Sequence, residues 1–116
     1  MFNFFGKKDS GNETTAEEVN RRLAAGERLF VLDVREPDEF AEARIEGSVL
    51  IPLSQVAMRS SEIPRDRPVV AVCRSGSRSG VATDMLRRAG YTNVLNMRGG
   101  MMAWVRAGLP WKRGKP

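Results

Sequence analysis

The stretch that decides the fold reads Pro68-Val-Val-Ala-Val-Cys-Arg-Ser-Gly-Ser-Arg-Ser-Gly-Val-Ala-Thr-Asp-Met-Leu-Arg-Arg-Ala-Gly90. Its first apolar residues, 69–72, are rich in β-branched side chains, which predicts a fully buried strand. Residues 81–89 carry apolar side chains at helical spacing, and Gly90 is placed to cap that helix. Between strand and helix lies a short polar loop that begins at Cys73, the only cysteine of the chain.

The loop 73–80 has the composition of a site that activates a thiol. A strand, a tight loop and a helix place the sulfur where backbone N–H groups and the positive end of a helix converge. Gly76 permits the backbone conformation that such a loop needs, and successive N–H groups then form a nest for an anion. Arg74 and Arg78 add positive charge, so we expect the pKa of Cys73 to lie below the usual ~8.5. The alternative, a small buried hydrophobe at a strand end, accounts less well for this polar setting.

Histidine is absent from the chain. This excludes Ser-His-Asp and Cys-His catalysis within the chain, so a reactive Cys73 has only backbone dipoles and arginines to activate it. One cysteine and no histidine also argue against zinc and copper sites, and we expect neither a metal nor a cofactor. A single cysteine forms no internal disulfide, as is usual in a reducing compartment.

Length and composition are those of one ordinary globular domain: 116 residues, 41% hydrophobic and 28% charged. No run approaches the ~18 apolar residues that span a membrane, and residues 1–8 lack the features of a signal peptide. We therefore expect a cytoplasmic protein that does not contact a membrane. The net charge of +5 suits either nucleic acid or small anions. Aromatic residues do not alternate with basic ones, so we expect no nucleic-acid partner.

Strand and helix patterns alternate along the chain, which predicts an α/β fold with a mainly parallel sheet. The expected domain covers residues 13–113, between a flexible arm, 1–12, and a basic tail, 114–116. The expected elements are a helix capped by Thr15 with Glu18 three residues on, strands over 29–35 and 93–97, and helices over 36–44, 54–62 and 101–107. Within 45–53 we expect a turn at Gly47 and a short strand ended by Pro52.

The sequence also predicts which of several side chains outside the loop are buried, exposed or near the site. We expect Val56, Met58 and Ile63 in the core, Trp104 and Val105 facing inward, and the basic residues 112–116 solvated. Asp33 and Arg35 stand at the carboxyl end of a buried strand, where ligands bind in open α/β sheets. They are either site residues or an ion pair that ties down the loop, and the sequence leaves both open.

A cysteine phosphatase is an alternative for the same loop. Those enzymes separate a cysteine from an arginine by five residues, so that a ring of amides encloses a phosphoryl group. Here Cys73 and Arg78 are separated by four, and the loop should enclose a smaller anion. The NTPase motif Gly-x-x-x-x-Gly-Lys-Ser/Thr is absent.

From about Thr14 to Trp111 the chain resembles the rhodanese family of sulfurtransferases, in its small single-domain form. Three motifs carry the resemblance: Asp33-Val-Arg-Glu36 with Glu39-Phe40, the loop Cys73-Arg-Ser-Gly-Ser-Arg78, and a C-terminal set formed by Gly99, Gly100, Trp104, Gly108 and Pro110. The resemblance implies a five-stranded, mainly parallel sheet with helices on both faces.

It also implies that Cys73 accepts a sulfane sulfur from an anionic donor such as thiosulfate and holds it as a persulfide. The sulfur would then pass to cyanide or to a small-molecule or protein thiol. The loop amides would stabilise the persulfide, and the side chains of Arg74 and Arg78 would attract the donor. By position, the substrate-binding residues are Arg74, Ser75, Gly76, Ser77 and Arg78, and the supporting residues are Asp33, Arg35 and Ser79.

An alternative within the resemblance is a persulfide relay or regulatory binding module with little turnover of its own. The sequence leaves the oligomeric state open. One departure from the family is Ala43-Arg44-Ile45, where relatives often carry Gly-His-Ile. Arg44 could replace the histidine as a hydrogen-bond donor or point to solvent, and we expect the second.

Overall fold

The β-branched run after Pro68 forms the centre of the sheet. In the computed structural model, which describes residues 11–115, β4 (Val69–Val72) is buried along its whole length. It pairs in parallel with β2 (Phe30–Asp33) on one side and β5 (Val94–Met97) on the other. Strands that are buried on both faces read as continuous apolar runs, and 69–72 is such a run.

Two short strands complete the sheet. β1 (Glu13–Thr14) pairs with β5, and β3 (Val49–Leu50) pairs with β2. The strand order is β1-β5-β4-β2-β3 and all pairings are parallel, which confirms the predicted α/β fold with a five-stranded sheet. β1 was not predicted, because two residues, one of them a glutamate, give no recognisable strand pattern.

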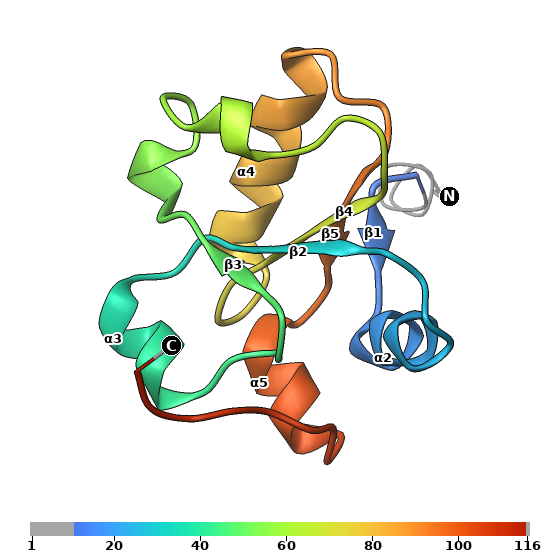
Figure 1. Cartoon of the computed structure of the whole chain (residues 1–116), viewed down its shortest axis with the longest axis vertical. Helices are drawn as coiled ribbons and strands as arrows, with labels where there is room; N and C mark the ends of the chain where they lie inside the picture. Colours follow the sequence, from blue (N-terminus) through green and yellow to red (C-terminus); the bar gives the residue numbers. More distant parts are fainter. Residues whose placement is uncertain (1–10, 116) are drawn as a thin grey trace, which may run out of the picture.

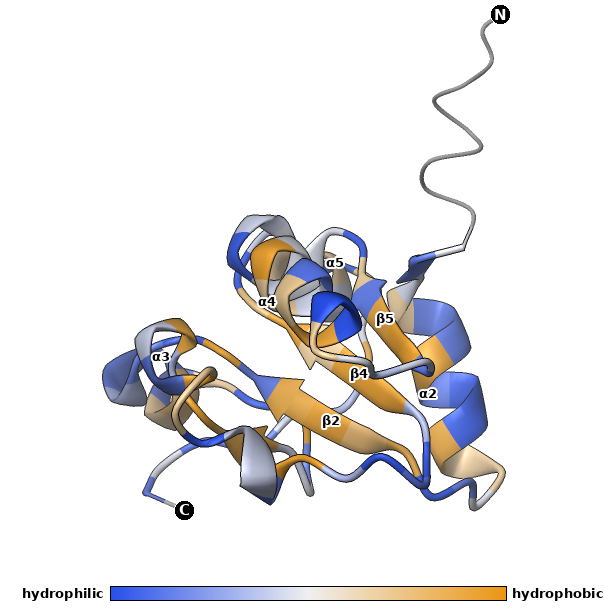
Figure 2. Cartoon of the chain, turned by 90° about the horizontal axis from the view of Figure 1, so that it is seen from above, coloured by the Kyte–Doolittle hydropathy of each residue, from blue (hydrophilic) through white to orange (hydrophobic). Residues whose placement is uncertain are grey.

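Helices cover both faces of the sheet, as predicted (Figure 1). α4 (Ser77–Arg88) lies on one face, and α2 (Ala16–Ala24) and α5 (Gly100–Arg106) lie on the other. α3 (Pro37–Glu42) lies beyond the carboxyl end of β2. Figure 2 shows hydrophobic strands in the sheet and helices that carry many hydrophilic residues. Two cores result, one under α4 around Leu32, Val69 and Leu86, and one under α2 and α5 around Val31, Val70 and Trp104.

Local capping agrees in part with the sequence patterns. The Thr15 hydroxyl accepts the Glu18 backbone N–H at 3.1 Å, as predicted, but the Glu18 carboxylate pairs with Arg21 instead of closing the capping box. α4 begins at Ser77, four residues before its first apolar residue, and Gly90 follows its end at φ +99°. The buried face of α4 therefore runs through Ser79, Ala82, Thr83 and Leu86.

Two core assignments and one helix were wrong. Met58 is 82% exposed and Val105 is 43% exposed, whereas Val56, Ile63 and Trp104 are buried as predicted. The expected helix over 54–62 is replaced by two 3-10 turns, Leu53–Gln55 and Ser60–Glu62. Met58 lies between these turns, so the helical periodicity that would have buried it is broken.

The expectation that Arg44 points to solvent was also wrong. Its Nη1 atom donates to the carbonyl oxygens of Phe40 at 3.2 Å and Gly114 at 2.6 Å. The backbone groups of Arg44 and Lys112 bond to each other in both directions, and the Gly114 N–H donates to Ala41. The backbone of 112–114 is therefore hydrogen-bonded to α3 and to Arg44, whereas the side chains of Lys112, Arg113 and Lys115 are exposed, as expected. Arg44 acts as a hydrogen-bond donor.

Most of the predicted arm, residues 1–10, lies outside the described residues. Within the rest of that range, the carbonyl of Asn12 accepts the Asn96 N–H and that of Gly11 accepts a bond from Arg87.

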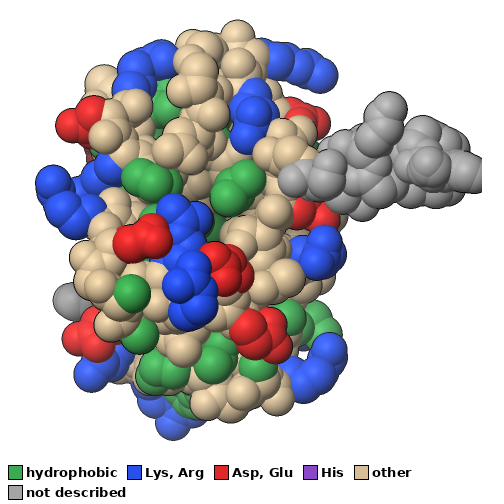
Figure 3. All heavy atoms as spheres, turned by 90° about the vertical axis from the view of Figure 1, so that its right-hand side faces the viewer, with side chains coloured by type: hydrophobic (Ala, Val, Ile, Leu, Met, Phe, Trp, Pro, Cys, Tyr) green, Lys and Arg blue, Asp and Glu red, His purple; other side chains and the backbone are tan. Residues whose placement is uncertain are grey.

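Figure 3 shows a face of the molecule on which acidic and basic side chains are interspersed. Among residues 11–115, no helix is both long and apolar enough to cross a membrane.

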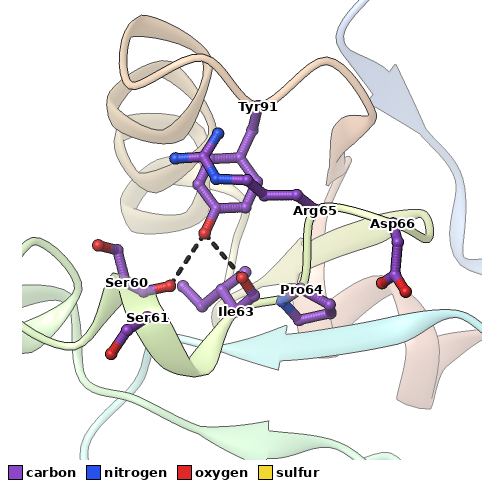
Figure 4. Close-up of a pocket in the computed structure, with 7 residues that line it drawn as sticks. All are labelled: Ser60, Ser61, Ile63, Pro64, Arg65, Asp66 and Tyr91. Atoms are coloured by element: carbon purple, nitrogen blue, oxygen red, sulfur yellow. Dashed lines mark hydrogen bonds between the residues drawn. The ribbon is translucent and has the colours of Figure 1, made fainter.

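Tyr91 fastens the end of α4 to the segment that leads into β4 (Figure 4). Its hydroxyl lies 2.7 Å from the carbonyl oxygen of Ile63 and 2.9 Å from that of Ser60, within donating distance of both. The Arg65 guanidinium stacks on the Tyr91 ring with its central carbon 4.0 Å from the ring centre. The ring is 5% exposed, so this hydroxyl is a buried polar group that needs its partners.

We expect Tyr91→Phe to lower the free energy of unfolding by about 1–2 kcal/mol, because it removes the one hydroxyl proton available to the Ile63 and Ser60 carbonyls. The ring, its packing and its stacking with Arg65 are kept, so the loss isolates the hydroxyl. Urea unfolding of the two proteins measures the difference. Equal midpoints and equal slopes would show that the hydroxyl contributes nothing to stability.

Candidate active site

Cys73 follows the last residue of β4, and the chain turns from it into α4. The residue is 1% exposed and belongs to the core on the α4 side of the sheet. Gly76, at φ +104°, occupies the left-handed region and precedes the first residue of α4. This conformation is open to glycine and lets the loop curl back over the sulfur, as the sequence predicted.

The first turn of α5 is hydrogen-bonded to this loop. The N–H groups of Met101 and Met102 donate to the carbonyl oxygens of Cys73 at 2.8 Å and Arg74 at 3.0 Å. In a planar trans peptide the C=O and the next N–H point in opposite directions. Two carbonyls directed at α5 therefore leave the N–H groups of Arg74 and Ser75 directed away from α5. Gly100 makes this close approach possible, because a Cβ there would overlap the same two carbonyls.

The sulfur of Cys73 is surrounded by donors. The Gly76 N–H lies 3.0 Å from Sγ and the Ser79 hydroxyl lies 3.2 Å from it. Burial opposes ionisation, but hydrogen bonds from the Ser79 hydroxyl and from the amides of Ser79, Gly76 and Ser75 outweigh it and lower the pKa of Cys73. The direction agrees with the sequence-based expectation.

The two arginines of the loop have different surroundings. Arg74 is exposed and lines a groove of about 400 Å³ together with residues of α3 and α5. Arg78 forms a two-pronged ion pair with Glu39 of α3, at 2.8 and 2.9 Å. These bonds lower the pKa of Glu39 to about 2, with the Glu36 N–H assisting against burial. Arg78 thus ties the loop to α3 as well as adding charge near the sulfur.

Asp33 and Arg35 form a buried ion pair. The Arg35 Nη2 atom lies 2.8 Å from the Asp33 carboxylate, and the two side chains are 5% and 1% exposed. Arg35 also donates to the carbonyl oxygens of Glu39 and Ala43, at 3.2 and 2.7 Å. The reading of this pair as an anchor for the loop after β2 is therefore supported. Arg35 thus binds α3 at Glu39 and the chain directly after it at Ala43, and the Glu39 side chain reaches Arg78.

The remaining predicted residues lie around the sulfur. Ser75 and Ser77 are exposed on the loop, whereas Ser79 is 0% exposed beneath it. Sequence reasoning gave no role to Asn96, whose Oδ1 atom lies 2.6 Å from the Ser79 hydroxyl, and none to Glu39. Asn96 comes from β5 and Glu39 from α3, so only the fold brings them to the loop. A polar residue within the otherwise apolar run 94–97 was the one available signal for Asn96.

Comparison with known proteins places this geometry in a family. A model of the Rhodanese-like domain family matches residues 15–107. The chain belongs to the rhodanese family. A sulfurtransferase of Allochromatium vinosum is 46% identical over 99 residues, which cover 85% of this chain and 92% of that protein.

Two further rhodanese-like relatives bear on function. The putative sulfur carrier protein YrkF of Bacillus subtilis is 35% identical over 80% of this chain and 50% of its own length. The crystal structure of thiosulfate sulfurtransferase from Pseudomonas aeruginosa superposes with a TM-score of 0.84 at 28% identity, over 95% of this chain and 22% of that one. These similarities support a sulfurtransferase-like rhodanese domain.

We expect Gly100→Ala to disturb the rhodanese loop, because the added methyl overlaps the carbonyls of Cys73 and Arg74. Gly108→Ala is the matched control, since Gly108 also has a positive φ, +74°, but has no heavy atom within 4 Å of the new methyl. Both carry the left-handed strain of about 1–2 kcal/mol. Thermal unfolding should show a larger loss for Gly100→Ala, and the pKa of Cys73 should rise only in that variant. Equal effects would contradict the proposed hold of α5 on the loop.

The pair of Glu39 and Arg78 gives a pH-dependent prediction. The folded pKa of Glu39, about 2, lies below the ordinary 4.5, so the pair stabilises fully above about pH 4.5 and loses this effect as the pH falls to about 2. Because both side chains are partly exposed, we expect Arg78→Gln to lower the free energy of unfolding by about 1 kcal/mol at neutral pH.

The difference between Arg78→Gln and the wild-type protein should shrink below about pH 4.5, measured by urea unfolding across the acid range. Arg59→Gln is the control, because Arg59 forms a similar pair with Glu62 at the surface, away from the loop. That variant should change stability little at any pH. A difference for Arg78→Gln that stays constant down to pH 2 would show that the Glu39 carboxylate is not involved.

Proposed function

We propose that this protein is a sulfurtransferase that carries sulfane sulfur on Cys73 between an anionic donor such as thiosulfate and a thiol or cyanide. One observation carries the proposal: the sulfur of Cys73 lies within 3.0 Å of the Gly76 N–H and 3.2 Å of the Ser79 hydroxyl, in a curled loop at a strand end. Such a setting favours a thiolate and a bound anion without histidine or metal.

In the first step the Cys73 thiolate attacks the outer sulfur of thiosulfate. The new S–S bond forms to Sγ while the old one breaks, and sulfite leaves with the electron pair of that bond. The charge of the resulting persulfide lies mainly on its outer sulfur. The amides of residues 74–78 stabilise this anion, and the exposed Arg74 attracts the doubly charged donor.

In the second step an acceptor thiolate or cyanide attacks the outer sulfur of the persulfide. The S–S bond to Cys73 breaks and Sγ leaves as a thiolate, which restores the starting state. The product is a persulfide of the acceptor, or thiocyanate. Asp33 and Arg35 support the site by fixing the loop after β2. A reducing compartment would keep the single cysteine free, in keeping with the cytoplasmic location that the sequence predicts.

A second candidate is a sulfur relay with little turnover of its own. It is favoured by the similarity to a putative sulfur carrier protein and by the burial of Cys73, which is 1% exposed. A relay would form the same persulfide but pass it efficiently only to a protein partner that docks on the loop. The two candidates therefore share the first step and differ in the second.

Incubation with thiosulfate followed by intact mass measurement tests the first step. We expect a gain of one sulfur atom that a reductant reverses, because Cys73 is the only cysteine. The matched control is Cys73→Ser, which keeps the size and a hydroxyl but should gain nothing. An unchanged mass for the wild-type protein, or the same gain in Cys73→Ser, would overturn the proposal.

Steady-state assays with thiosulfate and either cyanide or a small thiol distinguish the two candidates. A sulfurtransferase should complete many turnovers per Cys73 and release sulfite in proportion. A relay should release about one sulfite per protein and then stop, while remaining loaded. The second result would favour the relay without affecting the assignment of Cys73.

A further inference from the structure

The Ser79 hydroxyl has two acceptors and one proton. It lies 3.2 Å from the sulfur of Cys73 and 2.6 Å from the Oδ1 atom of Asn96. A hydroxyl donates a single hydrogen bond, so it cannot serve both acceptors at once. Both Ser79 and Asn96 are buried, at 0% and 6% exposure, so bulk water does not easily replace either bond. The Ser79 proton therefore points either to the sulfur of Cys73 or to the Oδ1 atom of Asn96.

The amide of Asn96 is held so that its oxygen faces Ser79. Its Nδ2 atom donates to the carbonyl of Gly76 at 3.1 Å and to the carboxylate of Glu13 at 3.3 Å. Both of these partners are acceptors, so the nitrogen must point toward them and the oxygen toward Ser79. Asn96 thus competes with the sulfur for one proton, from a position fixed by β1 and by the loop itself.

We propose that Asn96 is a positioning residue that holds the Ser79 proton while Cys73 is neutral and yields it to the sulfur when Cys73 ionises. In the neutral state the thiol S–H points at the Ser79 oxygen, and the Ser79 O–H points at Asn96. On ionisation the thiol proton leaves to a base in the solvent. The Ser79 O–H then turns to the thiolate, and Asn96 loses a hydrogen bond.

The same movement accompanies sulfur transfer, and this part rests on the proposed function. Once the persulfide forms, its charge lies mainly on the outer sulfur and Sγ no longer needs a strong donor. The Ser79 proton can then return to Asn96. When an acceptor removes the outer sulfur, Sγ leaves as a thiolate and the proton turns back. Asn96 therefore lowers the energy of the states in which Sγ carries no charge.

Several charged groups lie on the elements that surround the site. The groups on the elements that pack around the loop are Asp33, Arg35, Glu39, Arg78 and Arg74, and those behind Asn96 are Glu13 and Arg98. Their field shifts the ionisation of Cys73 but is common to the variants proposed below.

The sign of one mutational effect separates this role from a merely structural one. Asn96→Leu keeps the branched arrangement of the side-chain heavy atoms and removes the competing acceptor. In this variant the Gly76 carbonyl still accepts the Gly80 N–H, at 3.1 Å, and the Glu13 carboxylate still accepts a bond from Arg98, at 3.3 Å. The loop and β1 therefore retain these hydrogen bonds. We expect the pKa of Cys73 to fall by about one pH unit, the worth of one hydrogen bond. A loosened loop would instead raise it.

The measurement is the thiolate absorbance near 240 nm as a function of pH, with Cys73→Ser subtracted as the baseline. Ser79→Ala is the companion variant and should raise the pKa, because the thiolate loses its hydroxyl donor. In the double variant, Asn96→Leu should produce no further fall, since its effect acts through Ser79. A pKa that rises or stays unchanged in Asn96→Leu, or a fall that persists in the double variant, would overturn the proposal.

If Asn96→Leu does not fold, Asn96→Val takes its place, because a β-branched residue suits a strand and equally lacks an acceptor. Thermal unfolding establishes which variants are folded before they are titrated. The titration needs no sulfur donor, so it can fail while the persulfide forms normally. Conversely, an absent persulfide with the expected order of pKa values would reject the proposed function and leave the role of Asn96 intact.

Discussion

The site depends on the contact between the start of α5 and two carbonyl groups of the loop. Met101 and Met102 donate to Cys73 and Arg74, and the planar peptide then turns the following N–H groups away from α5. Gly100 is the residue that allows this approach, since any side chain would strike both carbonyls. Gly100 of the C-terminal motif and Cys73 of the loop thus belong to one structural unit, although they are far apart in sequence.

The pKa of Cys73 reflects a balance between burial and hydrogen bonding. Burial raises the pKa of a thiol, whereas the Ser79 hydroxyl and the loop amides lower it, and their net effect on the pKa of Cys73 is a decrease. A chain without histidine can activate a cysteine in this way, because fixed backbone N–H dipoles stabilise a thiolate without gaining or losing a proton. Arg78 pairs with Glu39 and thereby fastens the loop to α3.

The sequence was informative wherever a local pattern determined the outcome. The apolar run 69–72, the loop from Cys73 and the helix before Gly90 were predicted because strand composition, glycine and helical spacing act over a few residues. Met58 was misplaced because two 3-10 turns replace the expected helix. Val105 was misplaced because it lines the groove that α5 forms with residues of α3 and stays 43% exposed. Asn96, Glu13 and Glu39 reach the site from separate elements, and no local pattern shows such contacts. The boundaries of the domain and the roles of the site residues stay predictions.

Sulfur transfer by Cys73 is tested most directly by a crystal structure of the protein after reaction with thiosulfate. We expect one additional sulfur atom bonded to the Sγ atom of Cys73, with the N–H groups of the loop 74–78 within hydrogen-bonding distance of it and the hydrogen bonds from α5 to the loop unchanged. An unmodified Cys73, or an added sulfur that points away from the loop amides, would contradict the claim that this loop is built to carry sulfur.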